Sequence, residues 1–414
     1  MLICPDCFEN SSLQNRIKEI RPSFDEGQCE QHPSKKGVPI GEVARIMDEV
    51  ITNNYYVSGF DYHGEPTGLS LIDLIYDLTG ANHDDVATAL QNAIIDNESW
   101  WPGDGGEPFF SEENGYDRIT EVFDEHRSQK WEDFCGRIVS EQRFFNDRAQ
   151  QTLSEIFDGL QLLRDDRNEP AIHTLEPGKL TIFRARRANN SKSQETISSN
   201  VAQELGPPPP SLRMPGRMNP SGIPSFYGAF DLDTALAELR PAVGETIMAA
   251  QFEFVRPVVV LDTTKFERPP KALNIFAKTH NKRLSLWGFM AEFMNEISQP
   301  CLPGDEHLDY IPTQVVAEYL VHLHRFKHMG QEKTVEGIIF RSAQNREGKN
   351  IVLFGDAAKV KTHKSKPIKR LPLRDQRPPT LEVIENSLTT QVIAGVQVQA
   401  TPVYSGVHED DYDF

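Results

Sequence analysis

The spacing of hydrophobic residues along the chain changes near residue 170. Before that point apolar residues recur three and four positions apart, which is the period of one face of a helix. This spacing predicts helices in three segments, Val43 to Ile51, Leu71 to Leu78 and Val86 to Ile94, and a further long helical pattern runs from about Trp131 to Leu163. We therefore expect residues 39–168 to form an all-helical domain.

After residue 170 apolar positions alternate in short runs, as they do in half-buried strands. Leu180, Ile182, Arg184 and Arg186 fall on one face of a strand predicted at 179–186. Further strands are predicted at 247–254, 258–262, 337–341 and 351–354, and helices at 234–239, 284–296 and 313–323. Because strands and helices do not alternate regularly, we predict a mixed α+β domain over residues 170–358. The Ser-, Asn- and Pro-rich segment 189–215 is expected to be a loop.

Length and composition restrict the class of protein. A chain of 414 residues suggests two or three domains, and no apolar run reaches the roughly 20 residues that span a bilayer. The first residues lack the basic and apolar regions of a secretory signal, so a cytoplasmic location is expected. The net charge of -18 repels polyanions and disfavours nonspecific nucleic-acid binding. A small anionic ligand would require a local basic pocket.

Three of the five cysteines lie among the first 29 residues, together with one histidine that completes a metal-ligand spacing. Cys4 and Cys7 form one pair of ligands, and Cys29 and His32 form a second pair about twenty residues later. Four nitrogen and sulfur ligands make a closed tetrahedral site, which is typical of structural zinc. We therefore predict a zinc-binding segment over residues 1–38. The alternative is that these cysteines are ordinary reduced thiols.

The C-terminal segment 359–414 separates its charges. A basic run with interspersed prolines covers 359–377, and the chain ends in an acidic stretch. Such charge segregation is typical of a linker or an interaction tail. Val396 and Val398 alternate with glutamines, so an added edge strand is the alternative to a disordered tail.

The densest group of chemically informative residues lies between 213 and 240. It contains Gly216-Arg-Met-Asn-Pro-Ser-Gly-Ile-Pro224, then Phe226-Tyr-Gly-Ala229 and Thr234-Ala-Leu-Ala-Glu238. Phe183-Arg-Ala-Arg186 lies upstream, and Tyr310-Ile-Pro-Thr-Gln314 and Gly337-Ile-Ile-Phe-Arg-Ser342 lie downstream. The order of these motifs resembles the RES domain family over roughly residues 175–356. The helical region and its CxxC segment resemble the HEPN-like domain that is often attached to RES domains.

The resemblance implies an ADP-ribosyltransferase-like fold and an enzyme that degrades NAD⁺. RES toxins of toxin–antitoxin pairs cleave the nicotinamide–ribose bond by hydrolysis or phosphorolysis, and an antiphage role is a related expectation. By this resemblance the catalytic residues are Glu238, Arg217 and Tyr227. The residues that bind NAD⁺ are expected to be Arg184, Arg217, Asn219, Tyr227 and Ser342.

The chemistry of the reaction suits these residue types. Cleavage of an N-glycosidic bond develops positive charge on the ribose, and the Glu238 carboxylate can stabilise that charge. Guanidinium groups such as Arg217 and Arg184 can hold a pyrophosphate. Tyr227 offers a flat face for nicotinamide and a hydroxyl that can orient it. Ser342 can bond the carboxamide or a phosphate, and since no partner base is evident it is not expected to be a nucleophile.

Two other functions remain open at this point. The same fold and the same cationic intermediate can serve mono-ADP-ribosyl transfer to a macromolecule. A catalytically silent module that binds a protein or nucleic-acid partner is the second alternative. Expected partners are NAD⁺, an antitoxin or regulatory protein, and further copies of the chain in a homo-oligomer, with no membrane association.

Overall fold

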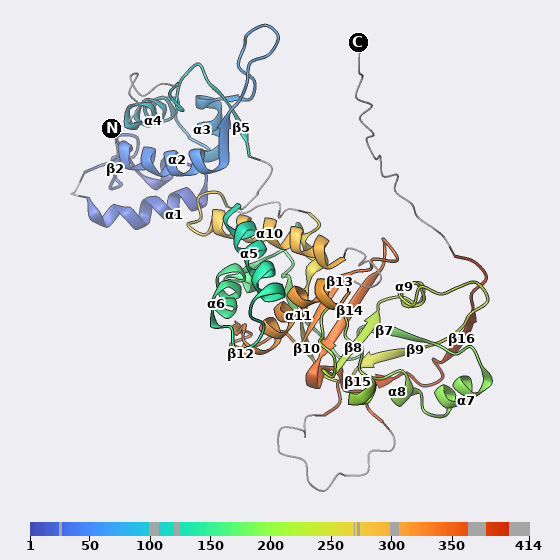
Figure 1. Cartoon of the computed structure of the whole chain (residues 1–414). Helices are drawn as coiled ribbons and strands as arrows, with labels where there is room; N and C mark the ends of the chain where they lie inside the picture. The colour runs from blue at the N-terminus through green and yellow to red at the C-terminus, as the bar shows by residue number, and fades with distance from the viewer. Residues whose placement is uncertain are drawn as a thin grey trace, which may run out of the picture. The chain divides into compact units, whose positions relative to one another are not determined.

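The computed structural model describes residues 1–24, 27–98, 107–119, 125–268, 270, 274–298, 306–362 and 378–396. The chain divides into two compact units (Figure 1). The N-terminal unit comprises residues 1–129, 162–169 and 268–290, and the sheet unit comprises residues 130–161, 170–267 and 291–414. Among the described residues, no helix is long and apolar enough to cross a membrane.

The N-terminal unit is built mainly from helices. These are α1 (Ser11–Ile20), α2 (Ile40–Asn54), α3 (Leu71–Thr79) and α4 (Asp84–Asn97). The apolar stripe of each helix is buried, as at Met47, Leu74 and Leu90, so the predicted helical periodicity is confirmed here. Both ends of helix α3 are capped: the Ser70 side chain caps its first turn, and Gly80 ends it in the left-handed conformation with a φ of 57°.

The region expected to be all helical also contains a small sheet. Strand β5 (Gly115–Arg118) lies between β3 (Tyr55–Val57) and β4 (Leu69–Ser70), and both pairs are antiparallel. A second pair, β1 (Leu2–Ile3) with β2 (Val38–Pro39), closes the N-terminal segment. Strands of two to four residues are too short for alternation to be read, which is why the sequence did not indicate them.

The sheet unit contains a nine-stranded mixed sheet, which confirms the predicted α+β class. The order is β15-β9-β7-β8-β14-β13-β10-β6, and β16 also pairs with β9. Only β10 and β13 are parallel among these pairs of described strands. The strands are β6 (Ile172–Leu175), β7 (Thr181–Arg187), β8 (Ser225–Ala229), β9 (Thr246–Phe254), β10 (Val258–Asp262), β13 (Gly337–Arg341), β14 (Lys349–Phe354), β15 (Leu381–Val383) and β16 (Thr389–Val392).

Aromatic side chains that belong to the same unit pack a group of helices together. It consists of α5 (Glu125–Ser140), α6 (Asp147–Ile156), α10 (His280–Ser298) and α11 (Glu306–His322), which Figure 1 shows together. Of these, α5 and α10 begin in residues assigned to the N-terminal unit. Phe293 of α10 contacts both Trp131 and Phe157, and Phe157 stacks on Tyr319 of α11. Helices α10 and α11 lie in the long connection between β10 and β13. A parallel pair requires such a crossover, so this connection follows from the sheet topology.

The segment expected to be a loop at 189–215 contains two helices instead. These are α7 (Ser191–Ser199) and α8 (Val201–Glu204). Asn190 and Ser193 form a reciprocal capping box at the start of α7, and Ile197 is buried. Helix α7 was not predicted because its sequence is mostly polar and it buries few apolar side chains. The remaining elements of the unit are α9 (Leu232–Ala237) and the hairpin of β11 (Phe326–His328) with β12 (Gln331–Lys333).

The C-terminal segment contributes two strands to the sheet. Strands β15 and β16 both pair antiparallel with β9. Most of the basic run, over 363–377, lies outside the described residues, as do Val398 and the acidic end at 397–414.

Candidate functional site

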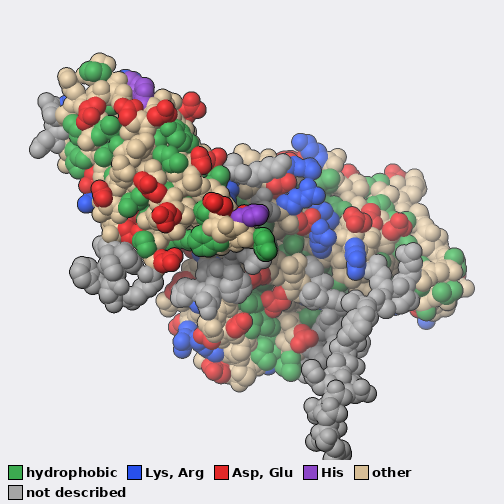
Figure 2. All heavy atoms as spheres, turned by 90° about the horizontal axis from the view of Figure 1, so that it is seen from above, with side chains coloured by type: hydrophobic (Ala, Val, Ile, Leu, Met, Phe, Trp, Pro, Cys, Tyr) green, Lys and Arg blue, Asp and Glu red, His purple; other side chains and the backbone are tan. Residues whose placement is uncertain are grey.

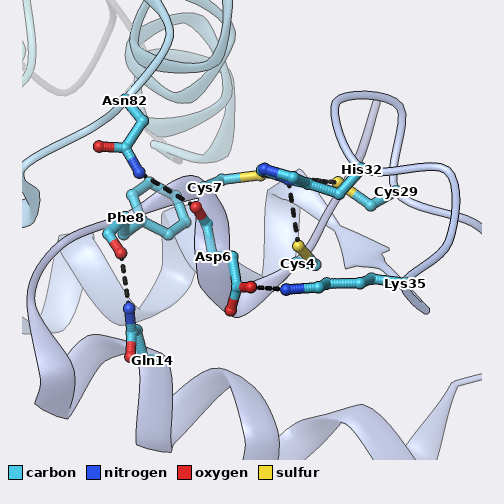
Figure 3. Close-up of polar contacts among 9 residues, drawn as sticks. All are labelled: Cys4, Asp6, Cys7, Phe8, Gln14, Cys29, His32, Lys35 and Asn82. Carbon is cyan, nitrogen blue, oxygen red and sulfur yellow. Dashed lines mark hydrogen bonds and ion pairs between the residues drawn. The ribbon is translucent and has the colours of Figure 1, made fainter.

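The four predicted metal ligands lie together in the N-terminal unit (Figure 3). Cys4 and Cys7 flank a single 3-10 turn over Pro5–Cys7. The pairing of β1 with β2 brings the chain back, so that Cys29 and His32 face this turn. The Sγ atoms of Cys7 and Cys29 are 3.5 Å apart, and Nδ1 of His32 lies 3.5 Å from Sγ of Cys4 and 3.6 Å from Sγ of Cys7.

These donor atoms fit one tetrahedral metal ion. All four lie within 4.8 Å of one another, and a tetrahedron with zinc–sulfur bonds of about 2.3 Å has edges of about 3.8 Å. Burial raises the pKa of Cys7 to about 12. Burial acts in the same direction on Cys29, but hydrogen bonds from His32 outweigh it and lower the pKa of Cys29 to about 7. A metal ion would stabilise the thiolates that burial disfavours.

The residues around the ligands brace the same loop. Asp6, inside the first ligand pair, forms an ion pair with Lys35, and its carbonyl accepts a hydrogen bond from Asn82 at 3.0 Å. The side chain of Gln14 donates to the carbonyl of Phe8 at 2.7 Å (Figure 3). The cluster is therefore part of the packed structure of this unit, and a metal ion bound by all four side chains would have no position left for a catalytic water.

In the sheet unit, the structure joins Glu238 to Ser342. The hydroxyl of Ser342 donates to Oε1 of Glu238 at 2.5 Å, and the side-chain amide of Asn350 donates to the same oxygen at 2.6 Å. We call these three residues the Glu238 group. Ser342 and Asn350 are 6% and 5% exposed, whereas Glu238 is exposed. One carboxylate oxygen is thus held from inside the protein, and among the described residues no hydrogen bond or ion pair reaches Oε2.

Local structure on both sides fixes the Glu238 group. Asp231 caps α9 by accepting the backbone N–H and the hydroxyl of Thr234, each at 2.7 Å. Glu238 follows directly at the end of this short helix. The hydroxyl of Ser342 also accepts the backbone N–H of Asn345 at 3.0 Å, and the Asn345 amide donates to Thr234 at 2.8 Å. The turn after β13 is therefore tied to the cap of α9.

A second group surrounds the Gly216–Asn219 turn, which contains Arg217. Gly216 and Asn219 exchange backbone hydrogen bonds of 2.9 and 3.3 Å. The hydroxyl of Tyr227 donates to Oδ1 of Asn219 at 2.7 Å and accepts the backbone N–H of Met218 at 3.2 Å. A Cβ at Gly216 would lie 2.7 Å from both Asn219 Oδ1 and the Tyr227 hydroxyl. Only glycine therefore fits at the start of this turn without displacing Tyr227 or Asn219.

The positions of Tyr227 and Asn219 bear on the roles expected from the sequence. Asn219 is 4% exposed, and its amide nitrogen is directed to the carbonyls of Met214 and Pro220. The Tyr227 hydroxyl is occupied within the turn, and burial raises the pKa of Tyr227 above its usual range. In this structure the Tyr227 hydroxyl and the Asn219 side-chain amide therefore both hold the Gly216–Asn219 turn.

The side chain of Arg217 reaches the crossover helices. Its guanidinium lies 5.4 Å from the ring centre of Tyr310 on α11, and Nη1 lies 3.4 Å from the backbone carbonyl of Glu296 on α10. The Glu296 carboxylate in turn accepts the indole N–H of Trp131 at 2.7 Å. The position of Arg217 thus depends on α10 and α11 as well as on its own turn.

Arg184 on β7 is the most deeply placed of the predicted arginines. Its guanidinium lies 4.7 Å from the ring centre of Phe226, and Nη1 is buried without a hydrogen-bond partner among the described residues. Burial lowers the pKa of Arg184 to about 10, so the group is charged at neutral pH. A half-buried cation whose Nη1 lacks a partner is suited to an anionic ligand.

The sheet register relates these groups to one another. Tyr227 pairs with Val352 and Ala229 with Asn350, so Tyr227 and Asn350 lie on the same face of neighbouring strands. Arg184 pairs with Ala250 and contacts Phe226, whose side chain alternates with that of Tyr227. The structure thus brings Glu238 together with Ser342, and Tyr227 with Asn219. It places Arg184 on the strand next to Tyr227, but with its side chain on the opposite face of the sheet from Tyr227 and Asn350.

Asn350 is the residue of this site that sequence reasoning missed. It lies at the start of β14, one position before the strand predicted at 351–354. Asparagine is a weak strand former, and its partner Glu238 is 112 residues distant in the chain. The Gly-Lys-Asn sequence that enters the strand was the one available indication, since a buried amide in a strand requires a partner.

Positive charge gathers locally on this acidic chain. Figure 2 shows a cluster of Lys and Arg side chains near the centre of the face in view, with further Lys and Arg side chains elsewhere on that face among dispersed Asp and Glu. A local concentration of cations is what an anionic ligand requires on a chain with a net charge of -18.

Comparison with known families identifies the domain that carries these residues. The RES domain family matches residues 181–375, which include Arg184, the Gly216–Asn219 turn, Tyr227 and the Glu238 group. This match confirms, for residues 181–375, the resemblance to the RES domain family that the motifs indicated. Comparisons with curated proteins and with solved structures found no match.

Proposed function

We propose that this protein degrades NAD⁺ by cleaving the bond between nicotinamide and ribose. The observation that carries the proposal is the Glu238 carboxylate, whose Oε1 is held by Ser342 and Asn350 while the residue is exposed. A carboxylate fixed through one oxygen can direct the other toward a ribose hydroxyl. There it would stabilise the positive charge that develops as nicotinamide leaves with the bonding electron pair.

The arginines supply the other requirement, which is binding of the pyrophosphate. Arg217 lies on a turn whose backbone is tightly fixed beside Tyr227. Arg184, on the opposite face of the sheet, offers an unpaired Nη1 as a second donor. Planar guanidinium groups are well suited to phosphate oxygens. The acceptor of the ribosyl cation is water in a glycohydrolase or inorganic phosphate in a phosphorylase, and both fit this proposal.

Nicotinamide release from NAD⁺ tests the proposal directly. Purified protein is incubated with NAD⁺ with and without phosphate, and the products are separated and identified by mass. ADP-ribose indicates hydrolysis, and ADP-ribose 1''-phosphate that forms only with phosphate indicates phosphorolysis. Glu238→Ala should reduce turnover by at least about 100-fold, as loss of a charge-stabilising group does. Glu195→Ala, at an exposed position on α7, is the matched control.

Mono-ADP-ribosyl transfer is the second candidate, because Glu238 is exposed and a macromolecular nucleophile could reach it. It would be supported if radiolabelled NAD⁺ labelled a protein or nucleic acid in a Glu238-dependent manner. A silent binding module is the third candidate. Calorimetry that detects no NAD⁺ binding, together with no turnover in either buffer, would favour that function.

We also propose a biological setting and a metal. The RES domain is associated with toxins that act on NAD⁺, so we propose a cytoplasmic toxin or antiphage effector, controlled by an antitoxin or regulatory protein and assembled as a homo-oligomer. Expression should lower cellular NAD⁺ and arrest growth in a Glu238-dependent manner. For the Cys4, Cys7, Cys29 and His32 cluster we propose structural zinc, which would hold the fold of a HEPN-like N-terminal domain.

A further inference from the structure

Helix α11 contacts the Gly216–Asn219 turn through two neighbouring side chains. The Gln314 amide nitrogen donates to the carbonyl of Gly216 at 2.8 Å and to the carbonyl of Asn219 at 3.1 Å. The Thr313 hydroxyl donates to the carbonyl of Arg217 at 2.5 Å. Three of the four carbonyls of the turn are thereby bound by one dipeptide, about one hundred residues distant in the chain.

These contacts are specific in their geometry. The two protons of the Gln314 amide reach the first and last residues of the turn, which already exchange backbone hydrogen bonds with each other. The glutamine amide supplies both donors from one nitrogen, whereas a glutamate carboxylate at this position would offer only acceptors to the two carbonyls. Thr313 is 5% exposed, so loss of its hydroxyl would leave the Arg217 carbonyl without this donor in a dry environment.

Arg217 depends on this arrangement from both ends. Its backbone carbonyl is held by Thr313, and its guanidinium lies over Tyr310 of the same helix. The other side of the turn is fixed by Tyr227 from the sheet. Because the turn is held between α11 and β8, the side chain of Arg217 leaves it in one fixed direction. A flexible loop of the same sequence would let that direction vary.

We infer that Gln314 and Thr313 are positioning residues, which set Arg217 for an anionic group of the substrate. This inference rests on the proposed cleavage of NAD⁺ for its catalytic readout. Since a pyrophosphate is bound equally in the ground state and the transition state, misplacement of Arg217 raises KM and leaves kcat nearly unchanged. A defect in folding alone would instead lower the fraction of active enzyme, and therefore kcat, at constant KM.

The test compares Gln314→Glu and Thr313→Val with Thr313→Ser in the full chain. The first two remove donors with little change of volume, and the third keeps the hydroxyl. Glu318→Gln, at an exposed position of α11, controls for changes on the helix surface. We expect KM for NAD⁺ to rise about 10- to 100-fold in Gln314→Glu, less in Thr313→Val, and within about twofold of wild type in Thr313→Ser and Glu318→Gln.

Hydrogen exchange of a peptide spanning 213–222 provides a readout that does not require activity. The amides of Gly216 and Asn219, protected by their mutual bonds, should exchange faster in Gln314→Glu and as in wild type in Thr313→Ser. If the wild type does not cleave NAD⁺ but exchange responds in this way, the result supports the role of Gln314 in holding the Gly216–Asn219 turn. In that case the proposed function fails. If the wild type is active and Gln314→Glu has the same KM, Gln314 does not position Arg217. If exchange in Gln314→Glu equals that of wild type, Gln314 does not hold the turn, whether or not the enzyme is active.

Discussion

The side-chain amide of Asn350 donates to Oε1 of Glu238 at 2.6 Å, across a separation of 112 residues in the sequence. This bond joins the start of β14 to the end of α9. The strand supplies a rigid, 5% exposed donor, and the short helix supplies an exposed carboxylate. A carboxylate that is held from the core is oriented without support from a ligand, and this orientation is what a charge-stabilising group needs before substrate arrives.

Replacing Asn350 by aspartate should therefore impair the site with almost no change in side-chain volume, because it replaces the donating NH2 by an oxygen. The new carboxylate would face Oε1 of Glu238, and two like charges at this distance repel each other and disfavour ionisation of one of them. We expect nicotinamide release to fall about 10- to 100-fold. Gln331→Glu, the same change at an exposed position of β12, should leave turnover unaltered. Equal turnover of Asn350→Asp and wild type would show that the bond to Glu238 has no catalytic consequence.

The metal cluster gives a prediction that depends on the ligand set alone. Cys7→Ser removes one of four converging donors, so zinc measured by mass spectrometry should fall from about one ion per chain toward zero. The N-terminal unit should then melt about 10 °C lower, as a loss of about 3 kcal/mol gives for a unit of this size. Cys135→Ser is the matched control, because Cys135 lies on α5 outside the cluster. Full zinc content in Cys7→Ser would contradict a four-ligand site.

The buried histidine of the N-terminal unit predicts a dependence of stability on pH. His280 is 2% exposed, and its Nε2 lies 3.0 Å from Oδ1 of Asn54. Asn54 donates its amide to the carbonyl of Val50, so Oδ1 is an acceptor and Nε2 of His280 carries the proton. Burial lowers the pKa of His280, and the charges of Arg118 and Arg283 lower it further.

The sign of the effect follows from this lowered pKa. Between the folded and the unfolded pKa the unfolded chain binds more protons, so the free energy of unfolding decreases as pH falls below the usual value of about 6.5. His280→Gln keeps a donor for Asn54 and does not titrate, so its urea midpoint should change less between pH 7.5 and 5.5 than that of wild type. His63→Gln, in an exposed turn, should retain the wild-type dependence. A His280→Gln profile as steep as that of wild type would remove His280 as the cause.

Apolar periodicity predicted several strands of the large sheet well. Strands β10 and β13 were expected at the residues where they occur, because their apolar runs are buried in the sheet. The capping box at Asn190 was present in the sequence, but the Ser and Pro content around it favoured a loop, and α7 was missed. Local pattern therefore identified elements whose stability comes from burial, and it failed where a polar helix is held by its cap.

The site was predictable in its residue types and less so in its contacts. Motif order singled out Glu238 and Ser342, which the structure joins directly. The hydroxyl of Tyr227 was expected to orient a ligand, yet it is used to hold the turn at Asn219. That bond, like the one from Asn350, depends on which strands become neighbours in the sheet. No local spacing specifies such pairing, because strand order is set by the whole fold.

Arg184 should show opposite effects on stability and on binding. Arg184 is half-buried, its guanidinium lies against Phe226 and its Nη1 is buried and unpaired, and a buried donor of a charged group that lacks a hydrogen bond costs stability. Arg184→Met keeps an unbranched apolar chain for the contact with Phe226 and removes the charge. We therefore expect the free energy of unfolding to rise by about 1–3 kcal/mol in urea titrations without ligand. Under the proposed function, NAD⁺ binding measured by calorimetry should fall at least about tenfold in the same variant.

The comparison with Arg186→Met separates this effect from a general consequence of charge removal. Arg186 lies on the same strand and the same face, but it is exposed and paired with Glu204 at 2.8 Å. Its loss should change stability by less than about 1 kcal/mol and leave NAD⁺ affinity intact. NAD⁺ should also raise the melting temperature of wild type and of Arg186→Met, and not that of Arg184→Met, because a ligand stabilises only the state that binds it. If Arg184→Met were instead less stable and still bound NAD⁺, the guanidinium would be a structural element of the core, and the free donor on Nη1 would have no part in holding the pyrophosphate.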